Sequence, residues 1–433
     1  MNNVVNNLGR GALGMAFLIF LCYIFSNNRK AIDWKVVIYA LIAMIAFYLG
    51  VTKVGFINGF FQFLSRAFVK MTDVEIESTR LIFSNLIEIR PDSWGFIFAV
   101  RVLPTIIFFS VLSSILYYTG VLQKIVYVFA WLLSKLKISG AESVSTSANI
   151  FMGQTEAPLM IKPYLEKMNR SEILCVMIGG MANTAGSVLG AYVSLLGASN
   201  PGGQEYFALH LLTQSILSAP AAIICAKILF PQTENVLTEV TIPKQKLGDN
   251  FLDAISMGTT DGLKLAVNVG AMLIAFTALI FVFNYMLFKI GDWTTLNTVI
   301  AANTPYKSLS FQMILGYIFS PVAWLIGIDS AEVLKAGSLL GEKTILNEFN
   351  AFFSFSNMQK DPAAMMRDPK SILITTYALS GFANFASIGI QIGGISQLAP
   401  SQRRNLTELG LKALLGGTIA CLMCGCIAGA LYG

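Results

Sequence analysis

Residues 153–159 read Gly-Gln-Thr-Glu-Ala-Pro-Leu, a polar stretch with a carboxylate in a strongly apolar part of the chain. A helix is expected before this stretch, over residues 141–151. After it, Thr155 can serve as the N-cap of a second half-helix, and Pro158 suits the first turn because its missing N–H would be unpaired there anyway. The stretch therefore predicts a break between two half-helices, with Glu156 beside unpaired backbone N–H groups.

The whole chain is apolar, because 55% of its 433 residues are hydrophobic and only 12% are charged. That composition is typical of an integral membrane protein and not of a large soluble enzyme. At membrane depth a carboxylate is rare, and a broken helix is tolerated only where it lines a cavity. We therefore expect a functional site at Glu156. The simpler alternative is a carboxylate that only caps a helix or faces water.

Eight stretches are long and apolar enough to cross, or nearly cross, a bilayer. They are 12–25, 36–51, 94–122, 173–196, 207–230, 265–287, 372–395 and 413–431. Residues 54–71 mix phenylalanines with basic residues, which predicts an amphipathic helix at the interface. Residues 140–168 and 329–355 carry polar breaks in their middles and are predicted as re-entrant hairpins. Residues 311–328 are expected at the interface or half-buried.

Lys and Arg residues flank the apolar segments and are absent from the connection at 197–206. By the positive-inside rule, this pattern puts both termini outside, in a multi-pass membrane protein. The excess of six positive charges is scattered, so it indicates membrane orientation and no nucleic-acid partner. The six cysteines lie in apolar segments and are expected to be reduced packing residues, and the lone His210 is expected to be a satisfied helix residue.

Three short motifs occur twice, in the same order. They are Gly-x-x-x-Ala-Val-x-Val at 95–102 and 262–269, Ala-Glu at 141–142 and 331–332, and Gly-x-Ala-Asn-x-Ala at 180–185 and 381–386. The topology above puts the two units in opposite orientations. That arrangement is an inverted repeat, an architecture that places a site near the midplane between the two halves.

The repeat brings together two similar polar clusters. They are Gln154, Thr155, Glu156 and Asn183 in the first unit, and Asn347, Glu348, Phe382, Asn384 and Ser387 in the second. Carboxylates accept hydrogen bonds from sugar hydroxyls, amides can pair with the edge of a base, and a phenyl ring offers a flat surface. The set therefore suits a neutral, polyhydroxylated, flat ligand. The simpler alternatives are that Phe382 belongs to the core and that the asparagines only join helices.

The motifs at 153–159, 347–349 and 381–388 resemble the signatures of the concentrative nucleoside transporters, and the resemblance covers almost the whole chain. It implies an all-α integral membrane protein with about eight transmembrane helices, two re-entrant hairpins in an inverted repeat, and interfacial helices. It also implies a homotrimer. In each subunit, a scaffold around 94–122 and 265–287 would support a transport domain that carries a nucleoside inward with a cation, like an elevator.

Carried over position by position, the resemblance implies a substrate site and a sodium site. The nucleobase would contact Gln154, Thr155, Glu156, Val188 and Leu265. The ribose would contact Glu348, Asn384 and Ser387, with Phe382 against the ligand. Sodium would be held by Asn149, Asn183 and the backbone of Met152 and Thr184.

The chain departs from the family pattern in two places. Asn183 stands where the family usually has a small hydroxyl residue, and Thr184 where it has a bulky aliphatic residue. Asn350 and Phe352 replace the usual Val and Tyr of the second hairpin. The first departure leaves the coupling ion open. It is either sodium, bound through the Asn183 oxygen, or a proton, carried by a buried carboxylate.

Five consecutive parts are predicted. They are an N-terminal part at 1–93, a scaffold helix and interfacial helix at 94–140, a first transport unit at 141–261, a second scaffold helix at 262–328 and a second transport unit at 329–433. An enzyme is excluded by the lack of a catalytic motif such as H-E-x-x-H, Gly-x-Ser-x-Gly or a P-loop. No organic cofactor is expected. A channel is the nearer rival, since broken helices also line pores.

Overall fold

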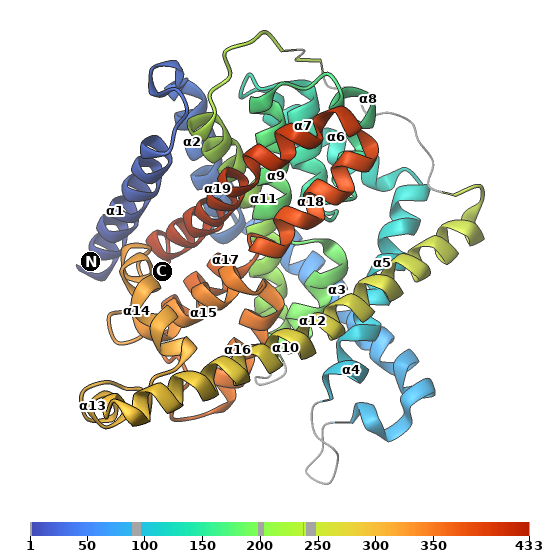
Figure 1. The fold of residues 1–433 in the computed structure, drawn as a ribbon. Helices are drawn as coiled ribbons and strands as arrows, with labels where there is room; N and C mark the ends of the chain where they lie inside the picture. Colours follow the sequence, from blue (N-terminus) through green and yellow to red (C-terminus); the bar gives the residue numbers. More distant parts are fainter. Residues whose placement is uncertain (1, 89–96, 198–202, 237, 240–247, 433) are drawn as a thin grey trace.

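The computed structural model describes residues 2–88, 97–197, 203–236, 238–239 and 248–432, and every regular element in those residues is a helix. The helices pack around a core of broken helices, and the two termini lie on the same side of the molecule (Figure 1). The expected all-α class is confirmed. Residues 94–96 of the third predicted crossing, with the start of its repeat motif, and residues 198–202 of the basic-free connection lie outside the described residues.

The N-terminal part supplies two helices that are long and apolar enough to cross a membrane. The first packs on the last helix of the chain, and the second packs on α11. The predicted interfacial helix is longer than expected, and the Ser65 hydroxyl ties it to α11 by donating to the Glu205 carbonyl at 2.7 Å. The elements are α1 (Asn2–Ile24), η1 (Arg29–Ala31), α2 (Trp34–Lys53), α3 (Gly55–Phe83) and η2 (Ser84–Ile87).

The first repeat unit contains a long apolar helix, a short helix beside it, a hairpin, a broken helix and a continuous helix. In chain order these are α4 (Phe98–Arg101), α5 (Leu103–Tyr118), α6 (Val121–Ser134), α7 (Gly140–Asn149), η3 (Ala157–Ile161), α8 (Lys162–Leu165), α9 (Arg170–Ala182), α10 (Gly186–Gly197) and α11 (Gly203–Leu229). The hairpin runs from α7 to α8. The broken helix is α9 followed by α10.

The second unit repeats this order. Its elements are α12 (Phe251–Trp293), α13 (Leu296–Asn303), α14 (Phe311–Leu325), α15 (Val333–Ile345), α16 (Glu348–Lys360), α17 (Pro369–Leu379), α18 (Phe385–Leu398), η4 (Pro400–Gln402) and α19 (Arg403–Ala430). The contacts repeat too, because α6 packs on the first hairpin helix α7 as α14 packs on α15. The half-buried segment predicted at 311–328 is therefore α14, the counterpart of α6.

Seven helical segments in the described residues are long and apolar enough to span a membrane. They account for seven of the eight predicted crossings. The remaining one, 372–395, consists of the two half-helices α17 and α18 with an irregular stretch between them. α12 is much longer than the predicted crossing at 265–287, with 43 residues, and it begins before the expected boundary at residue 262.

Small residues let α5 and α12, the two helices expected to form the scaffold, pack closely. A Cβ atom added at Gly258 would lie 2.7 Å from the Ser114 Oγ, and one at Gly262 would lie 2.8 Å from the Ile107 Cα. Both glycines are buried on the face of α12 that touches α5. Small residues spaced four apart are how membrane helices approach each other. The seam therefore makes α5 and α12 one closely packed pair.

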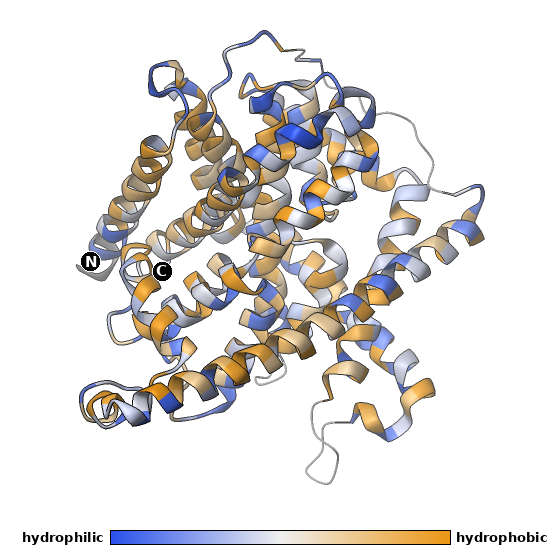
Figure 2. Ribbon diagram, in the orientation of Figure 1, coloured by the Kyte–Doolittle hydropathy of each residue, from blue (hydrophilic) through white to orange (hydrophobic). Residues whose placement is uncertain are grey.

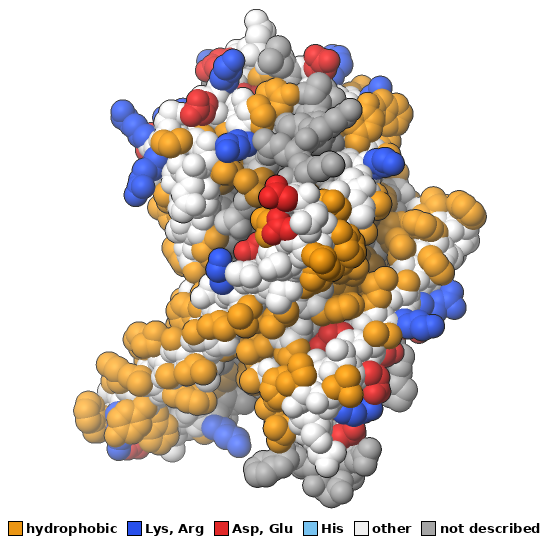
Figure 3. All heavy atoms as spheres, turned by 90° about the vertical axis from the view of Figure 1, so that its right-hand side faces the viewer, with side chains coloured by type: hydrophobic (Ala, Val, Ile, Leu, Met, Phe, Trp, Pro, Cys, Tyr) orange, Lys and Arg blue, Asp and Glu red, His pale blue; other side chains and the backbone are white. Residues whose placement is uncertain are grey.

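The rest of α12 is apolar and exposed. In its most apolar stretch only 11% of the residues are buried, against 94% for the stretch at Arg170–Gly197. Figure 2 shows α12 as hydrophobic along much of its length, and broad hydrophobic patches cover the face seen in Figure 3. Such a surface suits lipid or another protein subunit, and it does not suit water.

The repeated Ala-Glu motif ties down the first helix of each hairpin. Glu142 completes a capping box with Ser139 and also forms a buried ion pair with Lys227 of α11. Glu332 accepts hydrogen bonds from the backbone N–H groups of Arg367 and Asp368, just before α17. Breaking the Glu142–Lys227 pair would leave an uncompensated buried charge, so this pair fixes the first hairpin strongly. The second hairpin is held by the two backbone donors to Glu332.

Candidate functional site

The first hairpin breaks after α7, and the chain stays irregular until the short helix η3. The prediction that Thr155 is an N-cap is wrong. Glu156 precedes η3, and no side chain caps this helix. The reason lies in Pro158 and Pro163, which lack N–H groups and allow only a 3₁₀ turn and a single α turn in this part of the hairpin.

The two broken helices cross at their breaks. The Phe382 N–H donates to the Asn183 carbonyl at 3.2 Å, and the Gly381 N–H donates to the Thr184 Oγ1 at 3.0 Å. Gly381 has a φ of +105°, and a Cβ there would lie 2.6 Å from the Ala182 carbonyl oxygen. Only glycine satisfies both the left-handed conformation and the close approach. The breaks of the two repeat units therefore form one polar centre.

A chain of hydrogen bonds joins the two hairpins through this centre. Glu348, the first residue of α16, accepts from the Tyr192 hydroxyl at 3.2 Å and from the Asn384 amide at 2.9 Å. Asn384 caps α18 by accepting from the Ser387 N–H at 2.9 Å. The Ser387 hydroxyl accepts from the Gln154 amide of the first hairpin at 3.1 Å. Four predicted site residues thus lie in one network: Gln154, Glu348, Asn384 and Ser387.

These four side chains are all buried, with at most 8% of each residue exposed. A buried carboxylate requires hydrogen-bond partners, and bonds to a charged group are about twice as strong as neutral ones. Tyr192 and Asn384 supply two such bonds to Glu348. A carboxylate has about four lone-pair directions. Glu348 can therefore accept further bonds from the hydroxyl groups of a ligand.

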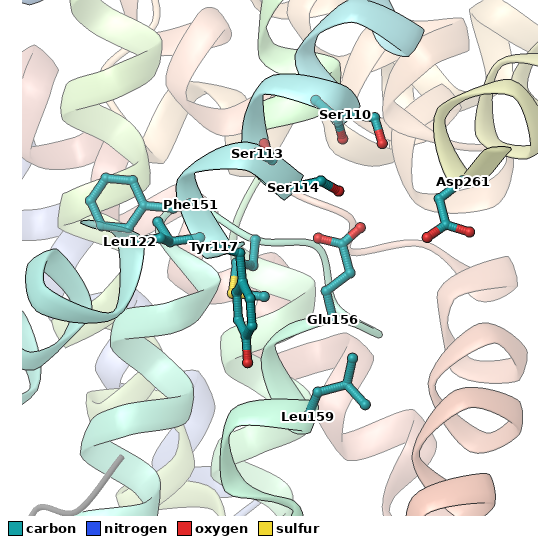
Figure 4. Close-up of a pocket in the computed structure, with 11 residues that line it drawn as sticks. Ser110, Ser113, Ser114, Tyr117, Leu122, Phe151, Glu156, Leu159 and Asp261 are labelled. Atoms are coloured by element: carbon teal, nitrogen blue, oxygen red, sulfur yellow. The ribbon is translucent and has the colours of Figure 1, made fainter. Parts of the chain in front are cut away.

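Glu156 lies apart from this network. Its carboxylate accepts from the Gly153 N–H at 3.1 Å and lines a pocket against the scaffold helices. In Figure 4 the carboxylate points toward Ser114 of α5, with Asp261 of α12 across the pocket. The pocket walls carry several hydroxyl groups, from Ser110, Ser113, Ser114, Tyr117 and Ser187. The two carboxylates of the predicted site thus have different surroundings.

The other predicted substrate contacts, Thr155, Val188 and Leu265 for the base and Phe382 against the ligand, have side chains that are wholly or partly apolar. Thr155 packs on α18, because its Cγ2 lies 2.8 Å from where a Cβ of Gly394 would be. Val188 is buried in α10, and Leu265 and Phe382 are half-buried. None of these four side chains has a hydrogen bond to the network in the part of the chain that the structure describes. They can supply surface for a ligand, while the network supplies polarity.

The predicted sodium ligands lie at two breaks of the first unit, the one after α7 and the one between α9 and α10. The Gly186 N–H joins these breaks by donating to the Phe151 carbonyl at 3.1 Å. Asn149 and Asn183 are each only 1% exposed, and among the described residues neither amide oxygen nor amide nitrogen of the two has a hydrogen-bond partner. Met152 lies in the same break. The Thr184 hydroxyl already accepts a hydrogen bond from the Gly381 N–H. The backbone carbonyl of Thr184 is therefore the oxygen of this residue that an ion could use. Unpartnered buried amide oxygens suit a hard cation, which prefers oxygen ligands.

Tyr192, Asp261 and Lys343 are not among the site residues predicted from the sequence. Tyr192 and Lys343 are buried, and Asp261 faces the pocket of Glu156. Asp261 and Lys343 carry no clear sequence signal, because each lies in a stretch with other charged or polar residues, at 259–264 and 341–344. Tyr192 carries none either, since a tyrosine in an apolar helix is common.

Comparison with known proteins agrees with this geometry. Three family models match: Na+ dependent nucleoside transporter N-terminus at residues 13–86, Nucleoside recognition at 99–199, and Na+ dependent nucleoside transporter C-terminus at 210–429. They lie in the expected order and together cover most of the chain.

Full-length relatives and a solved structure match as well. The chain is 40% identical to an uncharacterized transporter of Haemophilus influenzae and 35% identical to the nucleoside permease NupC of Helicobacter pylori, each covering 97% of both chains. The structure of CNTnw in an inward-facing substrate-bound state is 36% identical, covers 98% of this chain and 97% of its own, and gives a TM-score of 0.87. The chain therefore belongs to the concentrative, sodium-dependent nucleoside transporters, which are multi-pass plasma-membrane proteins and not enzymes.

Proposed function

We propose that this protein imports nucleosides by symport with a sodium ion, through an elevator-like form of alternating access. The observation that carries the proposal is the hydrogen-bonded chain from Gln154 to Glu348, which joins both hairpins beside the unpartnered amides of Asn149 and Asn183. A site built from both halves of an inverted repeat lies where the two transport units meet, so in an elevator it would move with both units as one body.

The ribose would be held by Glu348, Asn384 and Ser387. Glu348 retains acceptor capacity after its two bonds, and Ser387 offers a hydroxyl. The base would lie toward the first hairpin, where Gln154, Thr155 and Glu156 offer an amide, a hydroxyl and a carboxylate. Val188, Leu265 and Phe382 would provide the apolar walls. A planar heterocycle with a polar edge fits that combination.

Sodium would be held by the Asn149 and Asn183 side-chain oxygens with the backbone carbonyls of Met152 and Thr184. The Asn183 amide supplies an oxygen in place of the family's hydroxyl, so the ligand is exchanged and not lost. The Asn183 carbonyl already accepts from Phe382, next to the proposed ribose site. An ion there would order the crossing of the two breaks. Sodium and nucleoside would then raise each other's affinity, as linkage demands.

The moving part would be the two transport units, α7 to α11 and α15 to α19, against the α5–α12 scaffold, because α12 starts at Phe251, inside the predicted unit 141–261. The Glu156 pocket lies between these parts and is lined by small hydroxyl side chains of α5. The exposed apolar surface of α12 suits contact with further copies of the chain. We infer a homotrimer, which native mass spectrometry of the detergent-solubilised protein tests directly.

The function is tested by uptake of radiolabelled uridine and adenosine into proteoliposomes. Sodium and pH gradients are imposed separately, at matched membrane potential. We expect an inward sodium gradient to raise the nucleoside concentration inside the vesicles above that outside. The uptake rate should increase with the sodium concentration and saturate. A pH gradient alone should not.

Two outcomes would refute parts of this proposal. Uptake that only equilibrates the nucleoside, whatever gradient is imposed, would indicate a channel, because a channel cannot concentrate its substrate. Uptake that ignores sodium but follows an inward proton gradient would remove the sodium assignment. The carboxylates of Glu156 and Glu348 would then become the coupling groups.

A further inference from the structure

Helix α15 of the second hairpin has a buried lysine, Lys343, in its last turn. Lys343 is only 2% exposed, and a lysine is almost never fully buried unless it has a partner. Its ammonium donates to the carbonyl oxygen of Ala378 at 2.8 Å and to that of Ser380 at 3.4 Å. Both carbonyls lie at the carboxyl end of α17, where the second broken helix is interrupted.

The carboxyl end of a helix favours a positive charge. Its last carbonyl groups have no partner within the helix, and the helix dipole adds a partial negative charge there. At a break inside a membrane protein, water does not solvate these groups, so something else must. Lys343 therefore provides both hydrogen bonds and charge to the end of α17.

The internal repeat relates Lys343 to a residue of the first unit. The motif Gly-x-Ala-Asn-x-Ala aligns Gly180 with Gly381, and hence Gly179 with Ser380. In the first unit Asn149, the last residue of α7, packs on Gly179, since a Cβ there would lie 3.2 Å from the Asn149 Nδ2. In the second unit Lys343, in the last turn of α15, bonds to Ser380. The same place therefore holds a neutral amide in one unit and an ammonium group in the other.

We propose that Lys343 is a fixed cation built into the second unit, at the place that corresponds to the sodium site of the first. The inference rests on the sodium site proposed above. Lys343 is a positioning residue, because its charge holds the end of α17 and through it the break that carries Asn384, the partner of Glu348. In the second unit the chain itself supplies the positive charge at the break, through Lys343. In the first unit a bound sodium ion would supply it.

The surroundings of Lys343 make this testable by chemical rescue. Its side chain lines an apolar cavity of about 330 Å³ between α1, α14, α15, α17 and α19, with neighbours that include Leu18, Leu340 and Leu422. Replacing Lys343 with alanine enlarges this cavity. Propylamine is the part of the lysine side chain that alanine lacks, and its neutral form can enter apolar space before it is protonated.

The experiment measures uridine binding to purified Lys343→Ala protein by calorimetry, in sodium buffer with and without propylammonium chloride. We expect binding at least about tenfold weaker than wild type without the amine, since hydrogen bonds from a charged group are lost. Propylammonium should restore the affinity toward the wild-type value. Propionamide, which is similar in size but neutral, should not.

Lys335 provides the matched control. It lies on the same helix α15, and its ammonium also donates to a backbone carbonyl, that of Met365 at 2.7 Å, but away from the break. Lys335→Ala should bind uridine like the wild type and should not respond to the amine. Loss of binding in Lys335→Ala equal to that in Lys343→Ala would contradict a special role for Lys343.

Three results would overturn the inference. They are wild-type affinity in Lys343→Ala, restoration by propionamide as good as by propylammonium, and no restoration by propylammonium in folded protein. If Lys343→Ala does not purify as a folded protein, Lys343→Arg and Lys343→Met replace it. The inference then requires binding in the arginine variant and loss in the methionine variant, and the reverse refutes it.

The proposed sodium site and the proposed role of Lys343 can be refuted independently. Wild-type uridine binding that is indifferent to sodium refutes the proposed site at Asn149 and Asn183. Rescue of Lys343→Ala by the amine uses neither residue, so it still reports whether the second break needs a cation.

Discussion

The breaks of the two repeat units are built alike but completed differently. In the second unit, Glu348 has two side-chain donors and the end of α17 is held by Lys343. In the first unit, the side-chain amides of Asn149 and Asn183 are buried, and among the described residues they have no hydrogen-bond partner; Glu156 accepts from the backbone of its own hairpin, at Gly153. The second break is organised by the chain itself. The first break has buried side-chain amides without a hydrogen-bond partner among the described residues.

This difference teaches how one fold, used twice, can couple two ligands. A preformed half-site lowers the ordering cost of binding, because its groups are already in place. An incomplete half-site makes binding depend on whatever completes it. The contacts between the breaks, from Phe382 to Asn183 and from Gly381 to Thr184, connect the two. We therefore expect nucleoside affinity to depend most on the second unit and ion dependence to arise in the first.

The largest effect should come from Glu348→Ala. The change removes the acceptor for Tyr192 and Asn384 and, in our account, for the ribose hydroxyls. Each lost bond to a charged group is worth about 1.5–3 kcal/mol, so calorimetry should detect little or no uridine binding.

Glu342→Ala is the matched control for this change. Its buried carboxylate lies on the same hairpin but accepts from Gln312 of α14. That variant should lose stability and keep its uridine affinity once folded. Wild-type uridine affinity in Glu348→Ala would refute the assignment of Glu348 to the ribose. It would also contradict a larger contribution of the second hairpin to nucleoside affinity.

The next effect should be on sodium and come from Asn149→Ala. Losing one oxygen ligand of a cation costs about 1.5–3 kcal/mol, or about tenfold to a hundredfold in ion affinity. Sodium titration of uridine uptake should show the half-saturating concentration rising by that factor. Thr146→Val, one turn earlier on α7, should leave it unchanged. An unchanged sodium titration in Asn149→Ala would show that the unpartnered amide is not an ion ligand.

A smaller effect should follow from removing single hydroxyl groups from the ligand. If Glu348, Asn384 and Ser387 contact the sugar, deoxyribonucleosides should bind more weakly than ribonucleosides. The loss should be about 0.5–1.5 kcal/mol for a bond to Asn384 or Ser387 and about 1.5–3 kcal/mol for a bond to Glu348. Free nucleobases should hardly bind. Competition against labelled uridine uptake measures the series. Equal inhibition by uracil and uridine would mean that the second unit does not bind the sugar.

The smallest effect is expected for Asn183→Ser. This change restores the hydroxyl residue that the family usually has, and it replaces one oxygen ligand by another. Sodium dependence of uptake should persist, with at most a modest shift in the half-saturating concentration. Loss of sodium dependence would show that the Asn183 amide contributes more than an oxygen atom to the first break.

The sequence allowed the repeat and its breaks to be predicted because glycine, proline and polar residues in apolar helices are local signals. The paired motifs around Asn183 and Asn384 located both breaks, and the structure confirms that they meet. The cysteines are all free and buried as expected, and His210 contacts the Tyr377 hydroxyl at 3.1 Å. These features depend on residue type and spacing alone.

The features that escaped prediction depend on contacts between distant parts of the chain. Residues 341–344 read Gly-Glu-Lys-Thr, which resembles a solvated charged turn, and only the packing of α15 on α17 places Lys343 inside. Similarly, nothing near Glu156 in the sequence indicates that it faces α5 and not Glu348. The N-cap predicted at Thr155 was wrong because the capping rules did not take account of Pro163. This second proline also lacks an N–H group, so this part of the hairpin forms only a 3₁₀ turn and a single α turn.

The most direct test of the unequal breaks is the number of sodium ions that enter with each nucleoside. It can be obtained from the reversal potential of uridine flux in proteoliposomes, measured at fixed sodium and uridine gradients. If the first break binds a mobile ion and Lys343 fills the second, a single sodium ion accompanies each uridine. Two sodium ions per uridine would mean that the second break also takes an ion from solution, and none would mean that the first break does not bind sodium.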